Sequence, residues 1–193
     1  MVKEPRPGRV KTRLAASVGT TRAAWWFRHQ SARILRDLDS PQWRLVLSVS
    51  PDHEGLTSRV WSAHLPRMPQ GQGDLGARMA RVFQTLPPGP AIIIGADIPG
   101  ITKAQIRASF AELGSHDAVF GPASDGGYWL VGLKRSRLAP KSLFKGVRWS
   151  TRDALSDTLG TMPGHTFSLT ATLDDVDDAT DLARLSPRQR HSI

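Results

Sequence analysis

Aspartates in two separate segments of the sequence have the chemistry of metal ligands. Asp97 closely follows the apolar run 91–94, which predicts a strand, and α/β sheets bind ligands at the carboxyl ends of their strands. Carboxylates beside phosphates are natural ligands of Mg²⁺ (or Mn²⁺), with substrate oxygens and water at the other positions. In the second segment, 173–182, alternation along an extended chain places Asp175 and Asp177 on the same side. One of these two side chains is therefore expected to face Asp97 across a metal ion.

Both acidic segments also have simpler explanations. Asp97 could instead cap a helix, and on its own this explanation is as good as a metal ligand. Asp178 and Asp181 are expected to belong to an acidic helix start, where carboxylates complement the positive end of the helix dipole.

A basic loop near the N-terminus could bind phosphate. Residues 3–13 contain two prolines that restrict the backbone and a glycine, Gly8, that permits a turn or a close approach. Four basic side chains can then converge on a polyphosphate: Lys3, Arg6, Lys11 and Arg13. The alternative is a solvated basic arm. Phosphate-binding loops of α/β proteins follow a central strand, yet only Met1 and Val2 precede this loop. We therefore expect a truncated first strand, with Met1 an internal methionine of a chain that starts upstream.

A glycine-rich segment, residues 70–79, is a second candidate for phosphate binding. Gly73 allows the backbone to approach a ligand at a predicted helix start, and Arg78 lies one turn into that helix. Asp74 stands between them and completes the predicted nucleotide-binding group. A plain loop with a helix cap explains these residues nearly as well.

Two further features are candidates for the acceptor side of a site. Asp125, Gly126 and Gly127 are first of all a hairpin turn, which is the interpretation we favour for this tripeptide alone. Trp149 could be a stacking platform for a substrate, although a tryptophan before a helix is more often a core residue. The six histidines show no metal-ligand spacing.

Hydrophobic periodicity predicts alternating helices and strands. The predicted helices cover residues 21–38, 73–86, 102–114, 150–159 and 179–185, and the predicted strands cover residues 43–49, 91–95, 118–120, 128–133 and 166–169. The wholly apolar run 91–94 is expected to be buried on both faces of a parallel sheet. Alternation of this kind predicts an α/β sandwich around a mostly parallel sheet.

The charge distribution favours anionic ligands. The 193-residue chain has a formal net charge of +9. Residues 1–36 contain nine basic side chains and one acidic side chain, and residues 134–148 contain six basic side chains and none that is acidic. Such a surface attracts phosphates, nucleotides or nucleic acid, and charge alone does not choose among them.

Composition excludes several classes of protein. There is no cysteine, so disulfides, thiolate metal sites and cysteine nucleophiles are excluded. No apolar stretch approaches the roughly 20 residues that cross a bilayer, and the N-terminus has no apolar signal region. We expect a cytoplasmic globular protein with no membrane partner.

Six ordered segments resemble a known transferase family. They are KEPRPGRVKTRL, QGQGDLGARM, IIIGADIPG, GPASDGGYWLVGL, LFKGVRWST and LDDVDDATDL. Together they cover nearly the whole chain and resemble the radical-SAM/selenodomain-associated transferase family, whose members are often labelled GT-A-fold glycosyltransferases. More distantly, the layout is similar to 2-phospho-L-lactate guanylyltransferase and molybdenum-cofactor guanylyltransferase, which share the nucleotide-diphospho-sugar transferase fold.

The resemblance implies a fold and roles for particular residues. It implies one GT-A-like domain over residues 1–186, a three-layer sandwich, followed by a basic tail over residues 187–193. Asp97 corresponds to the family's metal-binding aspartate, and Asp177 to the late aspartate that helps to hold the metal. The matches to the basic phosphate loop are Lys3, Lys11 and Arg13. Asp178 stands where we expect a threonine, a difference that should affect only a helix cap.

These observations predict a magnesium-dependent transferase with a nucleotide substrate and a small-molecule acceptor. We favour nucleotidyl transfer from a nucleoside triphosphate to a small phosphorylated or hydroxyl acceptor, with Lys11, Arg13 and Asp97 as catalytic residues. Magnesium would bridge phosphates and carboxylates, while Lys11 and Arg13 stabilise the leaving group. The alternative is a glycosyltransferase with a nucleotide-diphospho-sugar donor.

A non-enzymatic nucleic-acid-binding protein is the remote alternative. It would explain the charge of +9 but not the aspartates, which repel a phosphate backbone. Nucleic acid is therefore the least favoured partner, and the sequence is compatible with a homodimer.

Overall fold

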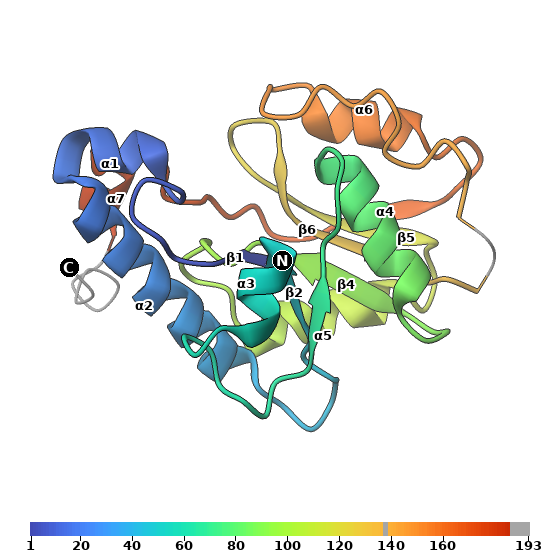
Figure 1. The fold of residues 1–193 in the computed structure, drawn as a ribbon. Coiled ribbons are helices and arrows are strands. Elements are labelled where there is room, and N and C mark those ends of the chain that lie inside the picture. Colours follow the sequence, from blue (N-terminus) through green and yellow to red (C-terminus); the bar gives the residue numbers. More distant parts are fainter. Residues whose placement is uncertain (137–138, 186–193) are drawn as a thin grey trace. The chain divides into compact units, whose positions relative to one another are not determined.

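The computed structural model describes residues 1–136 and 139–185, and these form two compact units (Figure 1). The first unit contains Met1–Pro69, Ala96–Ile101 and the C-terminal segment that starts at Asp175. The second unit contains Gln70–Gly95 and Thr102–Asp174. The expected domain end at residue 186 and the basic tail, residues 187–193, lie outside the described residues.

The first unit combines a short parallel sheet with helices. Its strands, in the sheet order β1-β2-β3, are β1 (Val2–Lys3), β2 (Leu47–Ser50) and β3 (Arg67–Pro69). Its helices are α1 (Thr12–Val18), α2 (Thr20–Leu38), α3 (Asp52–Thr57) and α7 (Ala179–Arg184). In Figure 1, α1 lies beside both α2 and α7, so the N-terminal and C-terminal segments of the chain meet in this unit.

The core of the first unit joins residues that are far apart in the sequence. Leu14 of α1, Trp26 of α2 and Val49 of β2 are almost completely buried in the same cluster, which also includes Val176 from the C-terminal segment. Trp25, in contrast, is 58% exposed, because neighbouring positions on a helix point in different directions. This packing fixes the C-terminal segment against α1 and β2.

The second unit is built on a mixed sheet. Its strands, in the sheet order β4-β6-β5-β7, are β4 (Ala91–Ile94), β6 (Tyr128–Leu133), β5 (Ala118–Pro122) and β7 (Phe167–Leu169). Its helices are α4 (Leu75–Thr85), α5 (Lys103–Glu112) and α6 (Ala154–Gly160). β6 is antiparallel to both of its neighbours, and β5 is parallel to β7.

The α/β class expected from the sequence is confirmed, and three of the five strand pairings are parallel. The first strand, expected to be truncated, is the two-residue β1, in which Val2 pairs with Val49 of β2. Among the described residues, no helix has the length and apolar character that a membrane span requires.

Two local expectations were wrong. β4 forms as expected, but it pairs antiparallel with β6 at one end of the sheet order, and its residues alternate between buried and half-buried. A run of four apolar residues does not distinguish a fully buried parallel strand from a half-buried antiparallel strand. The helix expected after Ser150 or Thr151 begins at Ala154, after Asp153, because a turn held by local hydrogen bonds comes first. The short elements α1, α3 and β3 carry too few residues for a periodic signal.

Candidate functional site

The basic loop ends at a residue with an unusual backbone conformation. Lys11 precedes α1 with φ 46° and ψ 52°, the left-handed region that costs a non-glycine residue free energy. Its carbonyl oxygen nevertheless accepts the first helical hydrogen bond, from the N–H of Ala15. Gly8, with φ 77°, turns the loop before this point. The Lys11 side chain therefore has a defined starting direction, set by the loop and α1.

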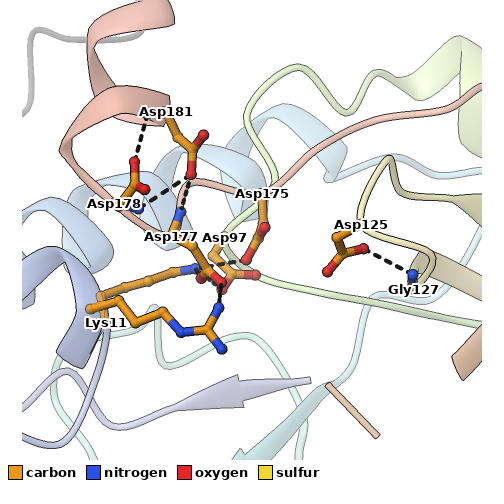
Figure 2. Close-up of polar contacts among 9 residues, drawn as sticks. Lys11, Asp97, Asp125, Gly127, Asp175, Asp177, Asp178 and Asp181 are labelled. Carbon is orange, nitrogen blue, oxygen red and sulfur yellow. Dashed lines mark hydrogen bonds and ion pairs between the residues drawn. The ribbon is translucent and has the colours of Figure 1, made fainter. Parts of the chain in front are cut away.

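That side chain ends among three carboxylates (Figure 2). The Lys11 Nζ lies 2.7 Å from Oδ2 of Asp97, 3.0 Å from Oδ2 of Asp175 and 3.0 Å from Oδ1 of Asp177. The side chain is only 6% exposed, whereas each carboxylate is partly open to solvent. We call these four residues the Lys11 cluster. The sequence predicted Asp175 and Asp177 on one side of an extended segment, with one of them facing Asp97, and the structure brings all three aspartates together around a lysine.

The positions of Asp175 and Asp177 follow from the residue between them. Val176 is 1% exposed in the core of the first unit, so the extended chain turns its two neighbours away from that core. The backbone N–H of Asp177 also donates to Oδ2 of Asp181, 3.0 Å away. Asp178 caps α7, as expected, and exchanges hydrogen bonds with Asp181 in a capping box. The alternation predicted from the sequence is confirmed, and it aims both carboxylates at Lys11.

The four basic residues expected to converge have different partners. Arg13 Nη1 lies 2.8 Å from Oδ2 of Asp177, with a side chain that is 71% exposed. Arg6 lies 2.7 Å from a carboxylate oxygen of Glu54 in α3, and Arg9 lies 3.3 Å from the other oxygen of Glu54. Lys3 is an exposed residue of β1. The sequence analysis did not identify Glu54, because nothing but its charge marks it and it lies some 45 residues from Arg9.

The cluster shifts the pKa values of its members in opposite directions. Burial alone would lower the pKa of Lys11, but the three surrounding carboxylates outweigh burial and raise it above its usual value. Burial raises the pKa of Asp175 to about 6, although Lys11 opposes the shift. Burial would also raise the pKa of Asp177, but Lys11 and Arg13 outweigh it and lower that pKa. Lys11 is therefore firmly protonated, while Asp175 gains a proton more easily than Asp177 does.

The donor set of the cluster fits a hard divalent cation. Three carboxylate oxygens lie within 3.0 Å of one positively charged atom, and Mg²⁺ prefers carboxylate oxygens. In the part of the chain that the structure describes, however, no group of His, Asp or Glu is arranged to receive a metal ion directly. The centre of the three carboxylates is occupied by the Lys11 ammonium. The three aspartates could hold Mg²⁺ or Mn²⁺ once Lys11 has moved away.

The residues expected at the glycine-rich segment lie in the second unit and have local structural roles. Asp74 caps α4, accepting from the N–H of Ala77 at 2.8 Å. The Nε of Arg78 donates to the carbonyl of Gly73 at 2.9 Å. The guanidinium of Arg81 holds the same segment through backbone carbonyls. The loop-and-cap explanation accounts for this geometry, and nucleotide binding by these residues stays a prediction.

The hairpin turn expected at Asp125–Gly127 is present between β5 and β6. Asp125 Oδ1 accepts from the N–H of Gly127 at 2.8 Å (Figure 2), and Gly126 has φ 86°. Ser124, at the start of the turn, donates through its backbone N–H to a carboxylate oxygen of Asp174. Local bonds thus account for the shape of the turn, and an acceptor-binding role stays a prediction.

Trp149 packs in an aromatic group of the second unit. Its ring centroid lies 6.3 Å from that of Phe144 and 6.3 Å from that of Tyr128. The edge of the indole ring also closes over Gly76 of α4. Its indole N–H is buried and has no hydrogen-bond partner among the described residues. The core role weighed from the sequence accounts for the packing, while the free N–H is a donor that a bound molecule could use.

Solved structures with a similar fold include one with appreciable sequence similarity. A protein from Desulfovibrio desulfuricans G20, described as a "putative nucleotide-diphospho-sugar transferase", matches with a TM-score of 0.79 and 27% identity over 99% of this chain and 86% of its own. A homologue of Rv0371c from Mycobacterium sp. strain JC1 matches with a TM-score of 0.54 and 13% identity, covering 82% of this chain and 80% of its own. Rv0371c of Mycobacterium tuberculosis H37Rv matches with a TM-score of 0.53 and 14% identity, covering 95% of this chain and 92% of its own. The last two similarities concern the fold alone.

A family model matches residues 34–151, which is more than half of the chain. No curated protein matches the sequence significantly. The matched segment contains Asp97, Asp125 and Trp149 but neither Lys11 nor the late aspartates. The chain belongs to the family described as uncharacterized protein conserved in bacteria, DUF2064.

Proposed function

We propose that the chain is a transferase that uses a nucleotide-diphospho-sugar donor and transfers the sugar to a small-molecule acceptor. The observation that carries the proposal is the Lys11 cluster, in which cationic and carboxylate groups suited to a metal–diphosphate meet. The similarity to the Desulfovibrio protein, which extends over 99% of this chain, supports a donor of that class.

Nucleotidyl transfer, which we favoured from the sequence, is now the weaker candidate. It rested on a basic loop whose four cations converge on a triphosphate. In the structure Arg6 pairs with Glu54, so only Lys11 and Arg13 of that set meet at the aspartates. The similarity to a protein described as a nucleotide-diphospho-sugar transferase also favours glycosyl transfer.

In the proposed reaction the oxygen of an acceptor hydroxyl attacks the anomeric carbon of the sugar, and the hydroxyl proton passes to solvent. The bond between that carbon and the diphosphate oxygen breaks, and the nucleoside diphosphate leaves with the bonding electron pair. Asp97, Asp175 and Asp177 would hold the divalent cation, which when bound would neutralise charge on the leaving diphosphate. Arg13, exposed beside Asp177, donates to phosphate oxygens from the solvent side. The ammonium of Lys11 adds a second cationic donor, and the chain contributes chiefly position and charge.

Calorimetry would test the proposal. Nucleotide sugars, nucleoside diphosphates and nucleoside triphosphates are titrated into the protein with Mg²⁺ and with chelator. We expect Mg²⁺-dependent binding of a nucleotide sugar that Asp97→Asn weakens about a hundredfold or more, because it removes a charged ligand. Asp37→Asn, the same change on the exposed face of α2, is the matched control and should bind normally.

Two results would change the conclusion. Binding of a nucleoside triphosphate in preference to every nucleotide sugar would restore nucleotidyl transfer. Binding that is equal for Asp97→Asn and Asp37→Asn would remove the Lys11 cluster from the donor site. A product assay by mass spectrometry, with the preferred donor and a panel of hydroxyl acceptors, then identifies the transferred group.

A further inference from the structure

The Lys11 ammonium lies at the centre of the three carboxylates, the position that a bound metal cation would take. All three of its contacts are 3.0 Å or shorter, each to a different aspartate, and its side chain is 6% exposed. Arg13, in contrast, reaches one aspartate from outside and stays exposed. The two cations therefore have different places, one at the centre of the cluster and one at its edge.

A divalent cation and the Lys11 ammonium cannot share that centre. Mg²⁺ requires carboxylate oxygens at roughly 2.0–2.1 Å, closer than the oxygens stand around the ammonium. Two positive charges a few ångströms apart in a partly buried place also repel each other strongly. Binding of one therefore requires departure of the other, and the carboxylates Asp97, Asp175 and Asp177 serve both.

We propose that Lys11 is the resident cation of this site in the free protein and that a divalent metal ion enters only by displacing its side chain. Lys11 is thus a positioning residue for the metal site, since it holds three like charges together until the ion arrives. The inference rests on the proposed function in one respect, because the displaced ammonium is then available to the diphosphate of the donor.

The backbone of Lys11 is consistent with a side chain that is held rather than relaxed. A left-handed conformation at a non-glycine residue persists where surrounding contacts over-determine it. The three ion pairs are such contacts. The preceding loop contains Pro5, Pro7 and Gly8, so the side chain is anchored at its tip while its base follows a short, constrained turn.

The first test measures Mn²⁺ binding without any nucleotide, by the electron paramagnetic resonance signal of free Mn²⁺. Wild-type protein is compared with Lys11→Met, in which a flexible side chain one atom shorter than lysine replaces it and removes the central charge. Arg13→Met removes the same charge from the edge and is the matched control. We expect Lys11→Met to lower the Kd for Mn²⁺ about tenfold or more, and Arg13→Met to lower it no more than about threefold, because the central charge must be displaced whereas the edge charge is screened by solvent.

The second test uses wild-type protein alone, so it does not depend on the folding of a variant. An amine-acetylating reagent is applied with and without Mg²⁺, and modification of each lysine is read by mass spectrometry. We expect slow modification of Lys11, accelerated severalfold by Mg²⁺, and no effect of Mg²⁺ on the exposed Lys3 and Lys145.

Three results would overturn the inference. They are equal Mn²⁺ affinity for the two methionine variants, no binding of Mn²⁺ to any form, and modification of Lys11 that Mg²⁺ leaves unchanged or slows. Neither test contains a nucleotide. Failure of the proposed donor specificity therefore leaves these measurements interpretable, and failure of the cation exchange leaves donor binding to be judged by its own titration.

Discussion

The Lys11 cluster of the first unit and a local group of charges in the second unit arrange charge in different ways. The second group is formed by Arg148, Asp153 and Asp157, and we call it the Arg148 loop. Around Lys11, aspartates from two segments more than 70 residues apart meet one buried ammonium. Around Arg148, an exposed guanidinium bonds to Asp153 and Asp157, which lie within nine residues of it. Bringing three aspartates from distant segments together does not stabilise any one segment of the chain. The pairs made by Arg148 join close neighbours in the sequence, and they stabilise the conformation of a loop. The difference favours a ligand-binding role for the first and a structural role for the second.

The largest expected effect is on the stability of the first unit. Lys11→Met leaves three carboxylates facing one another, so we expect the free energy of unfolding at pH 7.5 to fall by about 3 kcal/mol. Arg13→Met removes an exposed partner of one aspartate and should cost less than about 1 kcal/mol. Urea unfolding in the presence of a chelator measures both. Equal losses for the two variants would show that the central and edge cations do not differ.

A glycine pair in the β5–β6 turn provides the corresponding test in the second unit. Gly126 has φ 86°, and a Cβ there would collide with the backbone of Arg152. The φ of Gly127 lies outside the left-handed range, and the atoms nearest to a Cβ there would be those of the Asp125 carboxylate, the closest at 3.1 Å. We expect Gly126→Ala to lower the free energy of unfolding by about 2 kcal/mol and Gly127→Ala by clearly less.

Variants of Gly126 and Gly127 also distinguish a purely structural role of this turn from a role in acceptor binding. If the turn is only structural, donor and acceptor binding by the folded fraction of Gly126→Ala should be unchanged. A loss of acceptor binding in the mildly destabilised Gly127→Ala would instead support the predicted acceptor role of this turn.

Asp175 and Asp177 face the same lysine, yet their replacement should have opposite effects. The raised pKa of Asp175, about 6, means that the folded chain holds this proton more tightly than the unfolded chain does. The contribution of this proton to the free energy of unfolding is therefore lost as pH rises from about 4 to about 6. Asp175→Asn, which cannot ionise, should therefore become more stable than wild type above pH 6, by no more than about 1 kcal/mol because the site is partly exposed.

The contribution of Asp177 to stability has the opposite pH dependence, because Lys11 and Arg13 lower the pKa of Asp177. Its stabilisation is present above the unfolded pKa of about 4 and is lost as pH falls. Asp177→Asn should therefore be less stable than wild type at pH 7, with the difference narrowing in acid. Thermal unfolding in chelator from pH 4 to pH 8 follows both variants, and curves that shift in the same direction would contradict the assignment.

Sequence patterns predicted the parts of this molecule that are settled locally. The helix predicted from residue 102 is α5, capped by Thr102 with Gln105, and the predicted acidic helix start is α7, capped by Asp178 with Asp181. The alternation of Asp175 and Asp177 about Val176 is likewise a property of one short segment. Such features depend on bonds between near neighbours, which the order of residue types expresses directly.

The parts that were missed depend on contacts between distant segments. Nothing in the run 91–94 shows that β4 pairs antiparallel with β6, because apolar residues suit either direction. The pairing of Arg6 with Glu54 and the burial of Lys11 among aspartates more than 80 residues away also require the folded chain. The sequence predicted that one of the two late aspartates faces Asp97, but not that the Lys11 ammonium lies at the centre of all three carboxylates.

The smallest expected effect concerns the Arg148 loop. Hydrogen bonds from Arg148 lower the pKa of Asp157 to about 2, so this pair stabilises the fold above the unfolded pKa of about 4 and loses that contribution as pH falls towards 2. Because Arg148 is exposed and Asp157 is partly open to solvent, Asp157→Asn should lower the Tm only slightly at pH 7, and the difference from wild type should narrow below pH 4. Thermal unfolding across pH 2–7 measures it, with Asp153→Asn, which loses a single contact to Arg148, as the milder comparison. Because this pairing is local, neither variant should alter Mn²⁺ affinity. A change in Mn²⁺ affinity at Asp157→Asn would mean that the two charged regions are coupled, and the division drawn between a ligand site and a structural loop would have to be given up.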